Sequence, residues 1–149
     1  MDREEMLRLF EAHRAAEAAR DIDAILETFA TFCFLETIPL GIRSEGKEAV
    51  RAAYEVQFFT AFPDLAPDDE GMAVGDDAIV VWGTLHGTSR GEWLGVAPGG
   101  GSFAVPFANL VPFKDGLMEG EKIYFDLATL CEQAQVPLGD IRAAAAARQ

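Results

Sequence analysis

Basic residues are scarce in this 149-residue sequence, which holds 12 Lys and Arg against 25 Asp and Glu for a net charge of −13. This balance argues against nucleic acid as a partner, because phosphate contacts need Lys or Arg. It argues equally against an anionic membrane surface. The sequence has neither a basic leader with a cleavage site nor an apolar run of about 18 residues, so we expect a soluble, cytoplasmic protein. An Ala- and Gly-rich composition with few Lys suggests a GC-rich bacterial genome.

Cysteine and histidine are equally few. Cys33 and Cys131 lie far apart without a CxxC pair, which is typical of two reduced, partly buried thiols. The two histidines, His13 and His86, have no HExxH motif or carboxylate cluster around them, so we expect no metal site. The run Gly99–Gly101 lacks the Lys and the following helix of a phosphate cradle, and no serine lies in a nucleophile-elbow pattern. We therefore expect no cofactor.

Half of the residues are apolar, enough for one domain with a real core. Hydrophobic periodicity and turn signals predict the following elements. They are helices over 3–19 and 22–29, a strand over 32–38, a helix from 44 to 63, strands over 68–74, 78–88, 103–113 and 117–126, and short helices over 127–134 and 138–147. Residues 1–149 are thus expected to form a single domain with a helical tail over 136–149. This order favours an α+β fold in which a strongly bent antiparallel sheet carries helices on its concave face and leaves a conical pocket.

The segment that begins at Asp115-Gly116 is the most informative. Asp-Gly is a strong two-residue hairpin signal, because both central residues of the favoured turn need positive φ. The strand after it ends in Asp126, directly before a helix. Asp126 either caps that helix or faces the pocket, where desolvation would raise its pKa and make it a general base. Tyr124 has the same strand parity, so its hydroxyl either meets a carbonyl oxygen of a substrate there or packs.

Four other polar or aromatic residues are candidates for the pocket. His13 interrupts the apolar face of the first helix, either as a core residue with one hydrogen bond or as a general acid or base. Glu36 shares strand parity with Phe34, so it either faces solvent or pairs with a pocket group such as His13. His86 and Trp82 share one face of a later strand, where a tryptophan more often packs than binds.

Five stretches carry a resemblance to a known family: Ala61–Leu65, Gly87-Thr88, Gly91–Pro98, Ile123–Asp126 and Gln133 after it. Their order resembles the SnoaL-like polyketide cyclases of the nuclear transport factor two-like superfamily, over roughly residues 5–136. The resemblance implies a cone-shaped barrel of a mixed, mostly antiparallel sheet, usually dimeric, that holds a hydrophobic small molecule. Catalytic members of the family use an acid/base carboxylate without metal or organic cofactor. They cyclise polyketide esters by aldol chemistry, and relatives isomerise ketosteroids or open epoxides.

The resemblance can be carried to single positions. It implies that Asp126 is the acid that closes the last strand. The strand before the hairpin, where the cyclases place a second catalytic histidine, offers only Asn109 as a polar group. Ile38 stands where the ketosteroid isomerases have a basic Asp before proline, and Ser89 where the family often has histidine. The tyrosine of their first helix falls on His13.

Two functions remain open. The first is an enzyme that removes a proton next to a carbonyl group, with Asp126 exchanging the proton and His13 and Tyr124 orienting the substrate oxygen. The second is a non-catalytic domain that binds a hydrophobic ligand, or assembles, through the same cone. We expect a homodimer through the exposed sheet face. The candidate pocket residues are Phe10, Phe34, Glu36, Tyr54, Phe58, Trp82, His86, Phe107 and Asn109.

Overall fold

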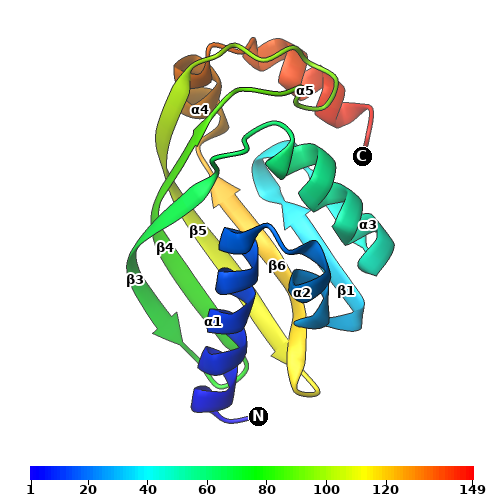
Figure 1. The fold of residues 1–149 in the computed structure, drawn as a ribbon, viewed down its shortest axis with the longest axis vertical. Helices are drawn as coiled ribbons and strands as arrows, with labels where there is room; N and C mark the ends of the chain where they lie inside the picture. The colour runs from blue at the N-terminus through cyan, green and yellow to red at the C-terminus, as the bar shows by residue number, and fades with distance from the viewer.

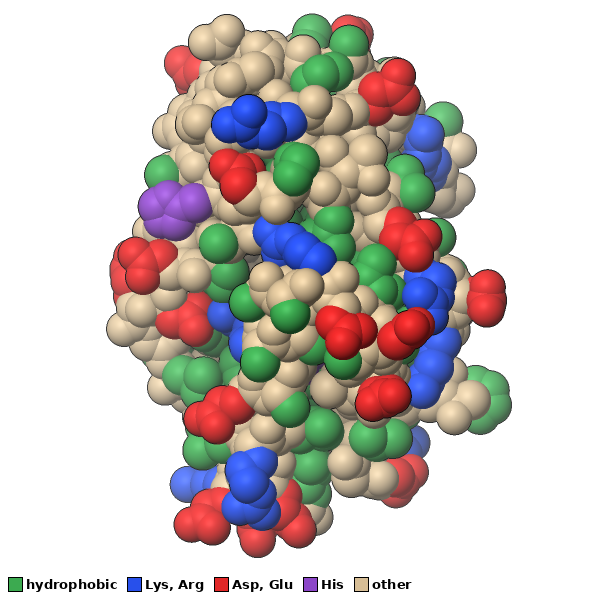
Figure 2. Space-filling view, in the orientation of Figure 1, with side chains coloured by type: hydrophobic (Ala, Val, Ile, Leu, Met, Phe, Trp, Pro, Cys, Tyr) green, Lys and Arg blue, Asp and Glu red, His purple; other side chains and the backbone are tan.

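A computed structural model describes residues 1–149, with helices packed on one curved sheet (Figure 1). Acidic and basic side chains are interspersed over the face of the molecule seen from this side (Figure 2). No helix is long and apolar enough to cross a membrane. In chain order the elements are α1 (Arg3–Ala19), α2 (Ile22–Glu27), β1 (Phe29–Thr37), η1 (Ile38–Leu40), β2 (Ile42–Glu45), α3 (Lys47–Ala52), η2 (Ala53–Phe59), β3 (Ala66–Val74), β4 (Ala78–Thr88), β5 (Ser102–Lys114), β6 (Leu117–Phe125), α4 (Leu127–Ala134) and α5 (Leu138–Ala146).

The six strands lie in the order β2-β1-β6-β5-β4-β3, and only the β1–β6 pair is parallel. Because β2 and β3 are both edges, the sheet curls into a cone without closing. The helices α1 and α2 lie across its concave face, while α4 and α5 cover the end where β6 finishes (Figure 1). The predicted α+β fold, with a curved, mostly antiparallel sheet and N-terminal helices on its concave side, is confirmed.

Two hydrophobic clusters fill the structure. One lies under α1 and α2 and includes Met6, Phe10 and Phe29, all at most 1% exposed. The other lies under α4 and α5 and includes Trp93 and Ile141. The side chains that pack against both clusters are Leu65, Leu85 and Phe125. These three side chains therefore mark the boundary between the two clusters.

The hairpin and the first two helices form as their sequences predict. Asp115 and Gly116 both have positive φ, +53° and +82°, as a two-residue hairpin between β5 and β6 requires. The Asp2 carboxylate accepts the backbone N–H of Glu5, and the Glu5 side chain returns a bond to Asp2, so a capping box starts α1. Asp21 caps α2, as predicted.

The predicted bounds of the second and third helices are wrong. Phe29, the predicted end of the second helix, begins β1. The third helix was predicted to begin at Ser44, but Ile42–Glu45 forms the edge strand β2 and the helix starts only at Lys47, after Gly46 with φ +86°. Four residues are too few for a periodic pattern, and their pairing with β1 is a long-range contact that local sequence does not contain. Arg43 stands opposite Glu36 in that pairing and forms an ion pair with it at 2.9 Å.

Beyond Ala52 the third helix widens into a π-helical segment, η2. π-Helical turns are rare and are often found at functional sites. In η2 the wider turn buries Tyr54, Gln57 and Phe58 on the sheet side. The segment thus brings a phenol and a second aromatic ring to the concave face.

A β-bulge in β6 changes the direction of its side chains. The pair Phe113–Met118 is followed by Leu110–Lys122, so β6 holds one more residue than β5 across this stretch. An extra residue reverses strand parity locally. Met118 and Glu121 are consequently both buried, at 0% and 1% exposure, although simple alternation would place them on opposite faces.

A Gly83→Ala substitution is expected to destabilise the sheet by about 1–3 kcal/mol, the usual cost of overpacking. A Cβ at Gly83 would overlap the backbone oxygen of Asp68 in β3, and backbone cannot move aside cheaply. Urea denaturation measures the loss. Gly139→Ala is the matched control, because a Cβ there meets open space. Equal stability of the two variants would contradict the close packing of β3 on β4.

Candidate functional site

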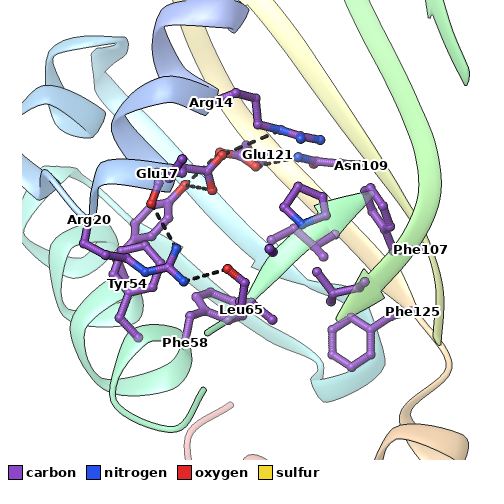
Figure 3. A pocket seen from close by; sticks show the side chains of 16 residues that line it. Arg14, Glu17, Arg20, Tyr54, Phe58, Leu65, Phe107, Asn109, Glu121 and Phe125 are labelled. Atoms are coloured by element: carbon purple, nitrogen blue, oxygen red, sulfur yellow. Dashed lines mark hydrogen bonds and ion pairs between the residues drawn. The ribbon is translucent and has the colours of Figure 1, made fainter. Parts of the chain in front are cut away.

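A cavity of about 320 Å³ lies between α1, η2 and the concave face of the sheet (Figure 3). Ligand pockets usually measure about 300–1,000 Å³, so this one suits a small molecule. One side is apolar, with Phe58, Phe59, Leu65, Leu85, Phe107 and Phe125 among its lining residues. The opposite side carries charged and amide groups from α1, β5 and β6.

The polar side is organised by a buried ion pair between α1 and β6. His13 Nε2 lies 2.6 Å from Glu121 Oε1, and neither residue is more than 1% exposed. The bulge in β6 supplies this geometry, since it turns Glu121 inward beside Ile123 and Phe125. Two ionisable groups without access to water must satisfy each other, because an unpaired buried charge is very costly.

The hydrogen bonds of His13 fix its protonation. The Thr28 hydroxyl donates its only proton to the carbonyl oxygen of Ile25, at 2.6 Å, so at 2.9 Å from His13 Nδ1 it can only accept. Nδ1 therefore carries a hydrogen. Nε2 lies against two carboxylates and carries a second one, so the ring is an imidazolium. Burial favours the neutral ring, but the charges of Glu17 and Glu121 outweigh it and raise the pKa of His13 to about 10.

Glu121 is held as an anion by three donors. Besides His13, the Tyr54 hydroxyl donates to Oε1 at 2.9 Å and Asn109 Nδ2 donates to Oε2 at 2.6 Å. Burial by itself would raise the pKa of Glu121, but the His13 charge and these hydrogen bonds lower it to about 2. Burial and the two neighbouring carboxylates raise the pKa of Tyr54 well above its usual value. At neutral pH the pair is charged and the phenol keeps its proton.

Glu17 is the carboxylate on this side that reaches the cavity and solvent. It lines the cavity, and its side chain is 26% exposed against 2% for Glu121. Its Oε1 lies 3.2 Å from His13 Nε2, and its Oε2 lies 3.4 Å from the Tyr54 hydroxyl. Figure 3 shows the Glu17 and Glu121 side chains converging near Tyr54.

Arg14 and Arg20 add two guanidinium groups to the cavity lining. Arg14 makes a bidentate bond to Asp69 of β3, at 3.1 and 3.3 Å, and lies 3.7 Å from Glu17. Arg20 donates to the carbonyl oxygens of Glu17, Pro63 and Leu65. Arg20 thus ties the end of α1 to the segment that precedes β3 (Figure 3).

The same cluster contains the only set of three potential metal-ligand side chains in the structure. One donor atom from each of His13, Glu17 and Glu121 lies within 4.8 Å of the others. A metal ion would have to displace the proton that Nε2 of His13 donates to Glu121, because a histidine ligand binds through a free nitrogen lone pair. The arrangement is complete as a proton-sharing network.

Asp126, the candidate acid of the sequence analysis, does not line the cavity. It is exposed and caps α4, accepting the backbone N–H of Thr129 at 3.1 Å and the Thr129 hydroxyl at 2.6 Å. These bonds lower the pKa of Asp126, opposite to the rise that a desolvated base would need. Of the two interpretations left open, the structure favours the helix cap.

The parity predicted for Tyr124, Trp82 and His86 is correct, but their face is the outer one. Trp82 and Tyr124 are 42% and 43% exposed, and His86 is exposed as well. The strand register places Trp82 opposite Ala108 and Ala108 opposite Tyr124. Trp82, His86 and Tyr124 therefore lie on the convex side of the sheet, away from the cavity.

The remaining candidates divide into two groups. Phe10 lies in the core, with its ring 6.4 Å from that of His13. The Arg43 guanidinium stacks on Phe34 and forms an ion pair with Glu36. Phe34 and Glu36 do not line the cavity. The candidates that line it are Tyr54, Phe58, Phe107 and Asn109.

Sequence reasoning missed Glu121 and Arg14 and gave Glu17 no role. Regular alternation along the last strand placed Tyr124 and Asp126 together and left Glu121 unremarked among apolar neighbours. The available signal was Gly120, because a glycine inside a strand often marks a bulge. For Glu17, the signal was its position four residues after His13, on the same helix face.

Comparison with known proteins assigns a family to this arrangement. The family model of the SnoaL-like polyketide cyclases matches residues 7–134 of this chain. A protein of Jannaschia sp. CCS1 described as a SnoaL-like polyketide cyclase is 29% identical, with a TM-score of 0.75 over 90% of this chain and 91% of that one. Among curated proteins, none matches.

Two more distant structures share the fold. TsrD of Streptomyces laurentii is 23% identical, with a TM-score of 0.74 over 92% of this chain and 99% of its own. A protein of Catenulispora acidiphila with a ketosteroid isomerase-like fold, solved with trimethylamine, is 17% identical, with a TM-score of 0.66 over 88% and 95%. At these identities the likeness shows the fold alone.

The buried pair of His13 and Glu121 should make the stability of the fold depend on pH. His13, with its pKa raised from 6.5 to about 10, stabilises fully below pH 6.5 and loses this effect as the pH rises toward 10. Glu121, lowered from 4.5 to about 2, stabilises fully above pH 4.5 and loses this effect as the pH falls toward 2. The contribution of the pair is therefore greatest between pH 4.5 and 6.5, which urea unfolding across the pH range measures.

Glu121→Gln should cost about 3–5 kcal/mol within that window, because it leaves His13 with a weaker partner. It should also lower the pKa of His13, measurable by NMR titration of the ring. Glu119→Gln is the control, since it removes the same charge from the same strand outside the buried network. If both variants unfold alike and His13 titrates unchanged, the pair does not stabilise the fold.

Proposed function

Because the chain belongs to the SnoaL-like polyketide cyclase family, we propose that its cavity binds a hydrophobic small molecule and that Glu17 transfers a proton next to a carbonyl group of that molecule. The observation that carries the proposal is a carboxylate on the cavity wall, backed by the buried pair of His13 and Glu121. A general base must lie within hydrogen-bond reach of its substrate, and the position of Glu17 on the cavity wall suits this role.

Glu121 is the weaker choice for the base. It already accepts three hydrogen bonds, and a pKa of about 2 makes it a poor proton acceptor at neutral pH. Its role is to hold His13 and Tyr54 in place. Both groups also lie beside Glu17, with His13 Nε2 3.2 Å from Oε1 and the Tyr54 hydroxyl 3.4 Å from Oε2.

Removal of a proton from carbon next to a carbonyl group places negative charge on the carbonyl oxygen. Arg14 and Arg20 are the cations on the cavity wall, and Asp69 uses only part of the five N–H groups of Arg14. The resulting enolate either regains the proton at another carbon, which is isomerisation, or attacks a second carbonyl carbon, which closes a ring. Apolar walls that include Phe58, Phe107 and Phe125 suit the flat frame of such a substrate.

The alternative is a non-catalytic domain that binds the same kind of ligand. The observation in its favour is the state of the buried pair. With pKa values near 10 and 2, His13 and Glu121 neither gain nor lose a proton near neutral pH. Within this cluster, Glu17 is then the group left to transfer a proton.

Proton exchange in D₂O distinguishes the two functions. We expect the protein to accelerate deuterium uptake next to the carbonyl group of some members of a panel of cyclic and aromatic ketones, followed by NMR. Glu17→Gln should slow this uptake about 10²–10⁴-fold, the usual contribution of a general base. Binding of the same ketones, measured separately by protein-detected NMR, should be retained.

Asp126→Asn is the control, because Asn caps a helix about as well as Asp and the side chain lies outside the cavity. Its exchange rate should equal that of the wild type. Wild-type exchange in Glu17→Gln would remove Glu17 from the mechanism. Binding of the ketones without any exchange in the wild type would establish the non-catalytic alternative.

We also propose that two copies pair through the convex face of the sheet. Trp82, Ala108 and Tyr124 form a row across three strands there, with two large aromatic side chains in solvent. Sedimentation should give twice the 16.1 kDa of one chain, and Trp82→Glu should give a monomer. Val56→Glu alters an exposed apolar residue away from the sheet and should leave the dimer intact. A wild-type monomer would refute the proposal.

A further inference from the structure

Arg20 is a cation on the cavity wall that has no carboxylate partner. It lines the cavity at the end of α1 and is half-buried. Its three hydrogen bonds go to backbone carbonyl oxygens, those of Glu17 and Pro63 at 2.9 Å and that of Leu65 at 2.6 Å. These carbonyl groups fix the position of the guanidinium but carry no negative charge. A charge that is partly removed from water is costly unless an opposite charge lies beside it, so this arrangement needs an explanation.

The other charged groups around the cavity already compensate one another. They are Arg14, Glu17 and Glu121 on the wall, with His13 and Asp69 next to them. His13 pairs with Glu121 at 2.6 Å, and Arg14 pairs with Asp69 at 3.1 Å. The Glu17 carboxylate lies 3.2 Å from His13 Nε2 and 3.7 Å from Arg14 Nε. With Arg20 included, the charges of the whole set sum to zero, and Arg20 is the cation that lies outside every ion pair.

Arg20 also keeps hydrogen-bond donors for a further partner. Of the five N–H groups of a guanidinium, the two on Nη2 and one on Nη1 are used, which leaves the Nε–H and one Nη1–H. The buried polar side-chain atoms without a hydrogen bond belong to Gln57, Trp93 and Asn109, so Nε of Arg20, which makes none either, is open to solvent. Figure 3 shows the Arg20 side chain running from α1 toward Leu65 at the cavity. A molecule in the cavity can therefore reach this group.

The guanidinium is held in place and keeps its charge. Its carbon lies 4.3 Å from the centroid of the Phe59 ring, which lines the cavity as well. Burial lowers the pKa of Arg20, while the charges of Glu17 and Asp64 oppose the decrease. Arginine stays charged at neutral pH all the same. A fixed cation beside an apolar wall suits an anionic oxygen at the end of an apolar molecule.

From this geometry we infer that Arg20 binds a carboxylate group of the ligand through its remaining N–H donors. The cavity then selects molecules with an apolar body and one terminal carboxylate above the neutral amides and esters of the same molecules. Phe58, Phe59 and Leu65 line the cavity and receive the apolar body. The inference rests on the proposed function only in taking this cavity as the binding site, and it does not require catalysis.

The experiment compares three ligands that share one frame: 2-naphthoate, 2-naphthamide and methyl 2-naphthoate. Dissociation constants come from chemical-shift changes of the backbone amides, at about 0.15 M salt to screen the net charge of −13. We expect 2-naphthoate to bind on the order of 10-fold more tightly than the amide or the ester, because a hydrogen bond between charged groups is roughly twice as strong as one between neutral groups.

The substitution Arg20→Met removes the cation and should abolish the preference for 2-naphthoate over the amide and the ester. Arg8→Met is the matched control, because it removes the same charge from α1 at an exposed position outside the cavity, where Arg8 pairs with Glu4. It should preserve the preference. Should Arg20→Met fail to fold, the Nε–H signal of Arg20 in the wild type gives a second readout. At slightly acidic pH, where this proton exchanges slowly and 2-naphthoate remains an anion, the signal should shift more with 2-naphthoate than with methyl 2-naphthoate.

Binding of 2-naphthoate no tighter than that of its amide or ester, or an unchanged preference in Arg20→Met, would overturn this inference and leave the proposed function standing. So would an Arg20 Nε–H signal that does not respond to 2-naphthoate. Failure to bind any of the three ligands would overturn both this inference and the proposed binding cavity. A preference for 2-naphthoate together with no deuterium exchange into the ketones would overturn only the catalytic role of Glu17.

Discussion

The buried ion pair of His13 and Glu121 is the interaction on which the rest of the site depends. It joins α1 to β6 across the concave face, and its remaining hydrogen bonds reach Thr28 after α2, Tyr54 in η2 and Asn109 in β5. Two desolvated charges tolerate little displacement, because each is the main compensation for burying the other. The pair therefore fixes where the first helix lies on the sheet.

This constraint also divides the cavity into two unlike sides. The network occupies one side with groups whose protons are already shared, and Glu17 is its more exposed carboxylate on the cavity wall. The other side is apolar, with aromatic rings from η2 and the sheet. A ligand meets hydrogen-bond acceptors at one end and hydrophobic contacts along its body, which connects the packing of the fold to the chemistry proposed for it.

Much of the fold was readable from the sequence because its signals are local. Strand alternation over 78–88, the Asp115-Gly116 turn and the Asp21 cap each involve neighbouring residues, and each is confirmed. The strand Ile42–Glu45 was missed because only its distant partner β1 stabilises it. At the site, His13 was identified from its position on an apolar helix face, whereas Glu121 was not, because the bulge that turns it inward arises from pairing with β5.

The sequence by itself determined the class of the protein: its charge, its α+β order, the hairpin and the resemblance to a cyclase family. Only the tertiary structure decided which carboxylates line the cavity, and these are Glu17 and Glu121. Asp126 and Glu121 lie five positions apart on neighbouring elements, and the residue pattern alone favoured the former. One extra residue in β6 buries Glu121 against His13 and leaves Asp126 in solvent as a cap. Strand register is a property of the assembled sheet, so the local sequence could not reveal that difference.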